Sequence, residues 1–295
     1  RHLHIDYYQA LEIISEDDLD ILIYTDIGMD VFTYELALQR LARVQMTMSG
    51  HPVTTGMPTM DYFISSQYLE TAESQKYYTE KLVPLNGLPD YEPVVVPERA
   101  SRKSLGMPEA GNLYFCPMTL FKIHPDFDVV IGNILDRDSA AQVLFLENKP
   151  DLHVRLGHRF EQQLGRERRE RIHFLSWADR QRFYQRLMAA DVILDSFYFG
   201  GGNTAYQALG LGCPIVTLDL PWNKSRWTQT MYQLMGMPEL IAKNRDDYVE
   251  LSVSVANNKP WNQSLRQKIL GANKVLFNNT TWSEELVAFC KTLTA

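Results

Sequence analysis

Residues 191–218 read DVILDSFYFGGGNTAYQALGLGCPIVTL, and this stretch decides the fold. It contains two short apolar runs, at 191–195 and 214–218, with a helical pattern over 204–211 between them. The apolar runs lack a polar face, so both faces of each expected strand should be buried. A buried strand, a crossover helix and a second buried strand predict an α/β protein with a parallel sheet covered on both sides.

The same alternation of strands and helices extends along the rest of the chain. Further strands are expected at 20–24, 44–48, 61–65, 113–117, 141–146 and 171–175. Helices are expected at 7–16, 33–41, 74–79, 125–136, 179–189, 225–235, 245–257, 262–277 and 282–293. Five prolines between 84 and 108 indicate a boundary between two lobes. The sequence therefore predicts a doubly wound protein with domains at 1–98 and 99–281 and a C-terminal helix at 282–295.

Length, charge and cysteine content narrow the class of protein. A chain of 295 residues suggests two domains, at roughly 150 residues each. The 29 basic and 36 acidic residues give a net charge of −7, which argues against a nucleic-acid partner, and no apolar run is long enough to span a membrane. Three widely spaced cysteines favour a reducing, cytoplasmic compartment. The chain starts at Arg1 and its first lobe is short, so we expect that lobe to be incomplete.

The glycine-rich loop at 200–202 and the helix after it are the strongest candidates for an anion site. Glycines let backbone N–H groups approach an anion, and a helix N-terminus adds unpaired donors and a partial positive charge. We expect Asn203 and Thr204 to cap this helix, and phosphate binding at Gly202, Asn203 and Thr204. The alternative is a turn that needs glycine only for its geometry. The loop matches neither the spaced glycines of the dinucleotide fingerprint nor a Walker loop.

Four charged or titratable residues outside that loop are candidates for chemistry. Lys122 follows the expected strand 113–117 and could neutralise charge on a departing diphosphate, although a lone lysine there is more often a solvated surface residue. His51 lies in a loop shaped by Pro52 and two glycines, where it could act as a base or orient a hydroxyl, although a lone loop histidine is usually structural. Arg180 and Arg186 flank the loop after strand 171–175, where a base or a phosphate would lie. No histidine spacing indicates a metal site.

Four groups of sequence segments, in this order, resemble the catalytic region of the protein O-GlcNAc transferase and Spindly-type glycosyltransferases and of their bacterial relatives. They are GHPVTTG at 50–56 with DYFI at 61–64, LFKIHP at 120–125, GNT at 202–204 with ALGLGCPIVT at 208–217, and MGMPELIA at 235–242. The resemblance covers nearly the whole chain. It implies a GT-B architecture of two Rossmann-like lobes and metal-independent, inverting transfer of a sugar, with no cofactor.

The resemblance also implies roles for individual residues. Lys122 is similar to the lysine that holds the diphosphate, and Thr119 lines the same site. The 202–204 loop resembles the diphosphate-binding loop of the family. Arg180 corresponds to a basic residue beside the uracil, and His51 to an active-site histidine of some bacterial members. Gln207 stands where the family usually has an acidic residue for the ribose hydroxyls.

These features favour transfer of GlcNAc from a UDP-sugar donor to Ser or Thr of a protein or peptide acceptor. Transfer of glucose to asparagine is an alternative that the His51 loop favours slightly. The short first lobe, the amide at Gln207 and the lack of tetratricopeptide repeats keep open a third hypothesis, a nucleotide-binding module without turnover. No membrane partner is expected, and the sequence leaves the oligomeric state open.

Overall fold

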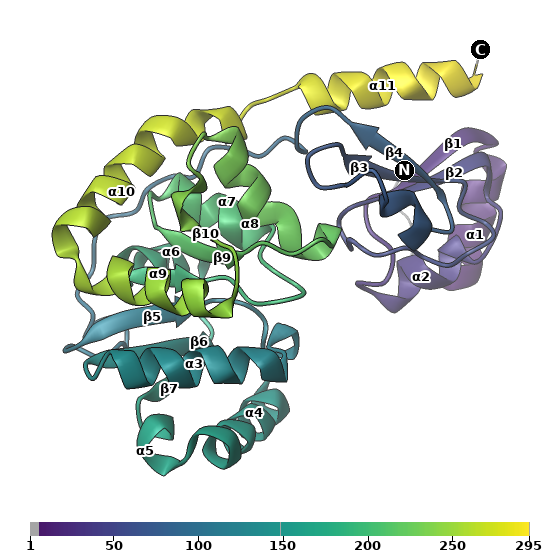
Figure 1. The fold of residues 1–295 in the computed structure, drawn as a ribbon. Helices are drawn as coiled ribbons and strands as arrows, with labels where there is room; N and C mark the ends of the chain where they lie inside the picture. The colour runs from purple at the N-terminus through teal and green to yellow at the C-terminus, as the bar shows by residue number, and fades with distance from the viewer. Residues whose placement is uncertain (1–5, 148, 295) are drawn as a thin grey trace. The chain divides into compact units, whose positions relative to one another are not determined.

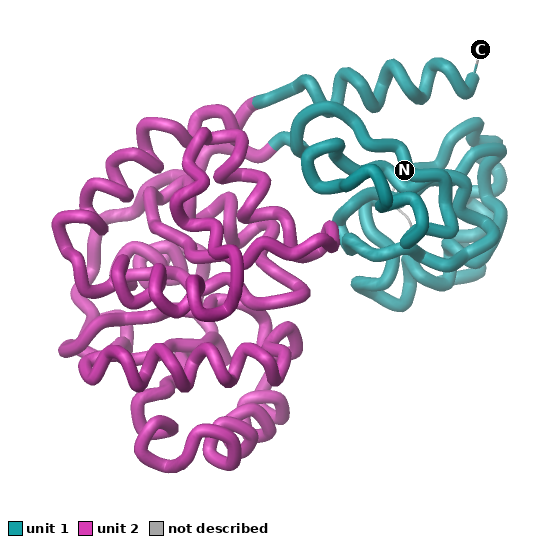
Figure 2. Tube along the Cα trace, in the orientation of Figure 1, with its two compact units in different colours: residues 1–90, 279–295 teal, residues 91–278 magenta. Residues whose placement is uncertain are grey.

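The computed structural model describes residues 6–147 and 149–294 and divides into two compact units (Figure 2). Unit 1 comprises 1–90 and 279–295, and unit 2 comprises 91–278. Both divisions lie a few residues before the boundaries that the sequence predicts. The first does so because the segment after residue 90 packs on unit 2, where the ring of Tyr91 stacks on that of Tyr206 with centroids 4.4 Å apart.

Unit 1 is built on a four-stranded parallel sheet whose strands follow one another in chain order, β1-β2-β3-β4 (Figure 1). The strands are β1 (Leu19–Tyr24), β2 (Ala42–Met48), β3 (Tyr62–Ser66) and β4 (Lys81–Leu85). The sequence analysis missed β4, because Pro84 marks the start of the proline-rich boundary. Pro84 is accommodated because β4 is an edge strand, where a missing N–H breaks no inner ladder.

Helices cover both faces of the unit 1 sheet. They are α1 (Tyr7–Glu16) and α2 (Val31–Ala37) on one face and α11 (Thr281–Thr294) on the other, with the 3-10 turn η1 (Ser74–Tyr77) where the sequence predicts a short helix. The buried Trp282 of α11 packs with Met46 and Ile64, and its indole N–H donates to the carbonyl of Ser65 at 3.3 Å. The C-terminal helix therefore completes the core of unit 1.

Unit 2 contains a six-stranded parallel sheet of order β10-β9-β8-β5-β6-β7. Its strands are β5 (Asn112–Cys116), β6 (Ala141–Leu146), β7 (Ile172–Leu175), β8 (Val192–Leu194), β9 (Ile215–Leu218) and β10 (Ile241–Ala242). From β5 the chain builds outward to β7, then returns to the other side of β5 and builds outward to β10. The strand order therefore switches direction between β5 and β8. The prediction of an α/β fold with parallel sheets is confirmed.

The helices of unit 2 lie on both faces of this sheet. They are α3 (Pro125–Arg137), α4 (Pro150–Leu164), α5 (Arg166–Arg169), α6 (Arg180–Ala189), α7 (Asn203–Gly210), α8 (Asn223–Leu234), α9 (Arg245–Asn257) and α10 (Lys259–Ala272), with the 3-10 turns η2 (Leu120–Lys122), η3 (Pro238–Leu240) and η4 (Asn273–Leu276). Helices α3 and α9 lie side by side (Figure 1), and α6 packs against α7. Asp179, Asn244 and Asn258 cap α6, α9 and α10 by accepting backbone N–H groups.

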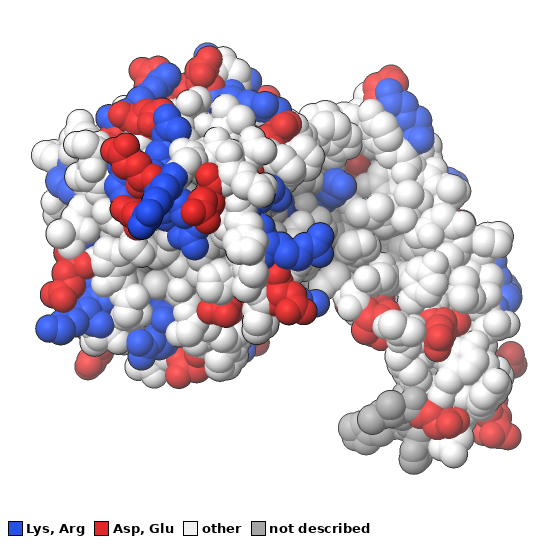
Figure 3. Space-filling view, turned by 90° about the horizontal axis from the view of Figure 1, so that it is seen from below, with Lys and Arg blue, Asp and Glu red and all other residues white. Residues whose placement is uncertain are grey.

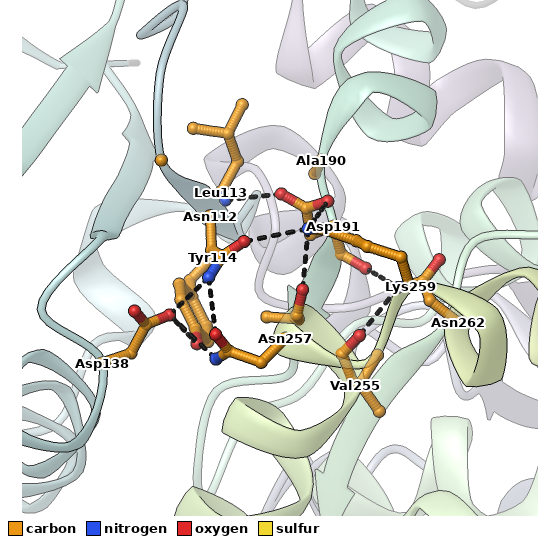
Figure 4. A network of polar contacts seen from close by, with 12 residues as sticks. Asn112, Leu113, Tyr114, Asp138, Ala190, Asp191, Val255, Asn257, Lys259 and Asn262 are labelled. Carbon is orange, nitrogen blue, oxygen red and sulfur yellow. Dashed lines mark hydrogen bonds and ion pairs between the residues drawn. The ribbon is translucent and has the colours of Figure 1, made fainter.

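A network of polar side chains fixes the edge of the unit 2 sheet at which β5 begins (Figure 4). The Oδ2 atom of Asp138 accepts hydrogen bonds from the Asn112 amide at 2.8 Å, the Tyr114 hydroxyl at 2.7 Å and the Asn257 amide at 3.1 Å. Burial alone would raise the pKa of Asp138, but these hydrogen bonds outweigh burial and lower it.

Asp191, just before β8, is the second acid of this network. Its carboxylate accepts from the backbone N–H of Leu113 at 2.8 Å, from the Lys259 ammonium at 2.8 Å and from the Arg102 guanidinium at 2.9 Å. These contacts join β5, α10 and the segment before β5 at one point, so the network acts as a structural clamp.

The distribution of charges, apolar helices and possible metal ligands relates to the expectations about nucleic acid, membranes and metals. On the face that Figure 3 shows, basic and acidic side chains are interspersed rather than gathered into one basic patch. Among residues 6–147 and 149–294, no helix is both long and apolar enough to cross a bilayer. The same residues contain no group of three or more His, Cys, Asp or Glu side chains placed to bind a metal.

Candidate functional site

The loops that follow β5 and β8 lie next to each other at the switch point of the unit 2 sheet. Strand β5 pairs with β8 through Tyr114 with Val192 and Phe115 with Ile193. Both strands point the same way, so the loops at 117–122 and 195–202 leave the same edge. In open α/β sheets, ligands bind in the crevice beyond the carboxyl ends of the strands, at such a switch point.

Lys122 and the glycine-rich loop are in direct contact at this edge. The Lys122 ammonium donates to the carbonyl of Gly200 at 3.4 Å and lies 3.9 Å from the ring centroid of Phe199. Burial lowers the pKa of Lys122, and the nearby Asp195 carboxyl opposes that shift. Thr119 begins the same turn and is half-buried, and its carbonyl accepts the backbone N–H of Lys122 at 2.9 Å.

Asp195, at the end of β8, organises the glycine-rich loop, and the sequence analysis missed it. Its carboxyl accepts the backbone N–H of Gly201 and the hydroxyl of Thr217, both at 2.9 Å, and its side chain is fully buried. Burial raises the pKa of Asp195, while these hydrogen bonds and the charge of Lys122 oppose the rise. An acid that ends an apolar strand beside a glycine run is the signal that could have revealed it.

Two of the three glycines serve the turn rather than an anion. The N–H of Gly200 donates to the carbonyl of Lys224 at 2.9 Å, and that of Gly201 is used by Asp195. A side chain at Gly200 would place its Cβ 2.9 Å from Asp195 Oδ1, so glycine is required there. The N–H groups of Gly200 and Gly201 therefore shape the turn, and the phosphate contacts predicted from the sequence are those of Gly202, Asn203 and Thr204.

The start of α7 retains the donors that an anion needs. Gly202 is the N-cap residue and makes no side-chain cap, so the prediction that Asn203 and Thr204 cap the helix is wrong; they are its first two residues. The first N–H groups of a helix lack partners within it and carry a partial positive charge. In α7 the N–H of Ala205 donates to the Gly202 carbonyl at 3.0 Å, so the donors offered to an anion are the N–H groups of Asn203 and Thr204. Together with the Lys122 ammonium beside the same loop, they form an electropositive edge suited to a diphosphate.

A pocket of about 260 Å³ lies beside this edge, near the ends of β6 and β7. Its lining residues are Leu146, Glu147, Trp177, Ala178, Arg180, Phe183 and Gln207. The structure thus brings the predicted residues Arg180 and Gln207 together with two aromatic rings. The Gln207 amide also donates to the Tyr91 hydroxyl at 3.3 Å, which fixes the orientation of the amide.

Arg186 does not take part in this pocket. Its guanidinium is buried and donates to the carbonyls of Ser176 at 2.6 Å and Leu105 at 3.1 Å. The interpretation of Arg186 as a residue for a base or phosphate is wrong. It instead ties the loop after β7 to the segment before β5.

His51 belongs to unit 1, whereas Lys122, Thr119, Arg180, Gln207 and the 202–204 loop belong to unit 2. It follows β2, at the carboxyl edge of the unit 1 sheet, and its carbonyl accepts the N–H of Val53 at 2.8 Å. The imidazole packs on Gly28, where an added Cβ would lie 3.0 Å from the ring. The ring is therefore held against the backbone of the loop after β1.

Solved structures with the same architecture define the class. A mutant of the Thermobaculum terrenum O-GlcNAc transferase matches with a TM-score of 0.78 and 23% identity over 98% of this chain and 55% of that one. The pneumococcal O-GlcNAc transferase GtfA, in complex with UDP and GlcNAc, matches with a TM-score of 0.52 and 15% identity over 97% of this chain and 59% of that one. The fold is that of the GT-B glycosyltransferases.

The chain belongs to glycosyl transferase family 41, whose model matches residues 92–286. Two Arabidopsis thaliana relatives are a probable UDP-N-acetylglucosamine–peptide N-acetylglucosaminyltransferase SEC, 27% identical over 93% of this chain, and the corresponding SPINDLY protein, 28% identical over 90%. The chain spans 29% of the length of each relative. The family resemblance seen in the sequence is confirmed.

Proposed function

We propose that this chain is the catalytic region of an inverting glycosyltransferase that moves GlcNAc from UDP-GlcNAc to Ser or Thr hydroxyls of proteins, without a metal. The observation that carries the proposal is the contact between Lys122 and the glycine-rich loop at the β5/β8 switch point. The printed names of the Arabidopsis relatives, which specify UDP-N-acetylglucosamine and peptide, support the choice of donor and acceptor.

The proposed reaction follows from the charges at this edge. The acceptor oxygen attacks C1 of the sugar, the bond from C1 to the phosphate oxygen breaks, and UDP leaves with the bonding electrons. Lys122 and the first-turn N–H groups of α7 stabilise the negative charge that develops on the diphosphate. Arg180, Gln207 and the aromatic rings of the neighbouring pocket hold the nucleoside. His51 accepts the hydroxyl proton of the acceptor.

Product analysis tests this assignment. The chain is incubated with UDP-GlcNAc and a Ser/Thr peptide, and a control peptide carries Ala at those positions. We expect the mass of one N-acetylhexosamine on the Ser/Thr peptide alone. Transfer from UDP-glucose to an asparagine peptide, or from GDP-fucose, with none from UDP-GlcNAc would overturn the proposed donor and acceptor.

One observation favours a nucleotide-binding module as a second candidate. Gln207 presents an amide, tied to Tyr91, where a carboxylate would bind the ribose hydroxyls more strongly. Calorimetric binding of UDP with no transfer to any acceptor would support this candidate over the enzyme.

A further inference from the structure

Glu80, directly before β4, is a buried acid outside the donor-binding edge. Only 2% of the residue is exposed. Its Oε2 atom accepts the hydroxyl of Thr54 at 2.7 Å, and its Oε1 atom accepts the backbone N–H of Thr55 at 2.7 Å and the Thr55 hydroxyl. Thr79 adds a longer bond at 3.3 Å. Two residues of the loop after β2 are thus fastened to one carboxylate.

The hydrogen-bonding pattern favours the charged form of Glu80. An ionised carboxylate only accepts hydrogen bonds, and every donor that the described residues give it is a hydroxyl or a backbone N–H. Burial alone would raise the pKa of Glu80, but the bonds from Thr55 and Thr54 outweigh burial and lower it. A neutral amide at this position would turn an NH₂ group toward the Thr54 hydroxyl, which would then accept instead of donate, and the hydrogen bonds from Thr54 and Thr55 would lose their charged acceptor.

The loop that Glu80 holds is the one that carries His51. Thr54 and Thr55 lie three and four residues after His51, and the Thr55 hydroxyl also accepts the N–H of Met57 at 3.1 Å. At the other end of the loop, the imidazole rests on Gly28. The histidine therefore sits between a fixed backbone contact on one side and the Glu80 clamp on the other.

We propose that Glu80 is a positioning residue for sugar transfer, which holds His51 in place through Thr54 and Thr55. This inference rests on the proposed function, in which His51 accepts the proton of the acceptor hydroxyl. A loop without its clamp would let the imidazole drift from the proton that it must take. A displacement of about 1 Å can cost about 100-fold in rate.

The variant Glu80→Gln tests the clamp, and Glu73→Gln is its matched control. Glu73 is an exposed acid of the same unit, paired only loosely with Lys76 at 3.3 Å. We expect Glu80→Gln to lower kcat for transfer by about 10- to 100-fold, at unchanged KM for the UDP-sugar. Hydrogen exchange at the Thr55 amide should accelerate, and Glu73→Gln should change neither quantity.

A double-mutant cycle with His51→Ala separates positioning from general structural support. In the His51→Ala background, Glu80→Gln should lower kcat by less than about twofold, because the residue that it positions is gone. An equal loss in both backgrounds, or a fully active His51→Ala variant, would overturn the inference. An unchanged hydrogen-exchange rate at the Thr55 amide in Glu80→Gln would also overturn the inference, whether or not the wild-type chain transfers sugar. A wild-type chain that transfers no sugar contradicts only the proposed function.

Discussion

The two edges of the unit 2 sheet carry buried carboxyl groups in opposite electrostatic situations. At the edge where β5 begins, hydrogen bonds outweigh burial and lower the pKa of Asp138. At the edge where β8 ends, burial dominates, raising the pKa of Asp195 and lowering that of Lys122. The first edge stabilises its charges with partners from the chain, whereas the second holds charged groups at an energetic cost.

This difference supports the proposal that the edge at Asp138 serves stability and the edge at Lys122 serves chemistry. Groups with pKa values shifted by burial cluster at functional sites, because burial and neighbouring charges tune such groups for binding and catalysis. Burial removes water from the Lys122 ammonium, and the negative charge of a bound diphosphate would stabilise that ammonium instead. The Asp138 network already has its partners, so its role is to hold β5, α3 and α9 together.

Removing the ammonium at the chemical edge should produce the largest effect on activity. We expect Lys122→Ala to lower kcat for sugar transfer by about 10²- to 10³-fold, because the departing diphosphate loses its nearest cation. The melting temperature should hardly change, since burial already opposes the charge of Lys122. Steady-state kinetics and a thermal melt measure the two quantities.

Lys268→Ala is the control for this variant. Lys268 is an exposed lysine of the same unit, 3.5 Å from Glu239. It should transfer sugar at the wild-type rate. Near-normal activity of Lys122→Ala would remove the basis for assigning the chemistry to this edge.

Removing the acid at the structural edge should affect stability and spare catalysis. Asp138→Ala leaves the buried hydroxyl of Tyr114 without an acceptor, so we expect a loss of about 1–3 kcal/mol in the free energy of unfolding. Asp136→Ala, which removes an exposed ion pair between the last turn of α3 and Arg168 of α5, should cost no more than about 1 kcal/mol. Urea titration measures the free energy of unfolding of both variants. A lower kcat per folded molecule in Asp138→Ala would contradict the assignment of this edge to stability alone.

The pH dependence of kcat and of kcat/KM tests the role of Lys122 in the unaltered chain. Since the pKa of Lys122 is lowered, its charge is lost as pH rises through a value below that of an ordinary lysine, about 10.4. The kcat/KM for the donor, which reports the free enzyme, should therefore fall at lower pH than kcat, because bound diphosphate restores the charge. We expect the two alkaline limbs to differ by about one pH unit or more. Coincident limbs, or an unchanged kcat/KM limb in Lys122→Arg, would contradict this role.

The elements and part of the site could be predicted from local sequence patterns. The apolar runs around β5, β8 and β9 predict buried parallel strands, and this places Lys122 and the glycine-rich loop at one edge. Resemblance to a family added roles for Arg180 and Gln207, which line one pocket. These features depend on residues close together in the sequence.

The remaining features depend on contacts between distant segments, which local patterns do not encode. The sequence places Arg186 beside a loop where a base or a phosphate would lie, but its partner Leu105 lies far before it in the chain. Glu80 has the same property, since the threonines that it binds belong to another loop. The place of α11 on unit 1 follows from Trp282 meeting strands near the start of the chain.

A crystal structure of the chain with UDP tests most directly whether the β5/β8 edge of unit 2 is the donor site. We predict that the diphosphate lies against the N–H groups at the start of α7, within hydrogen-bond distance of Lys122 Nζ. The uracil should occupy the pocket lined by Arg180, Phe183 and Gln207. A diphosphate bound elsewhere, or one that leaves Lys122 in contact only with Gly200, would contradict the assignment.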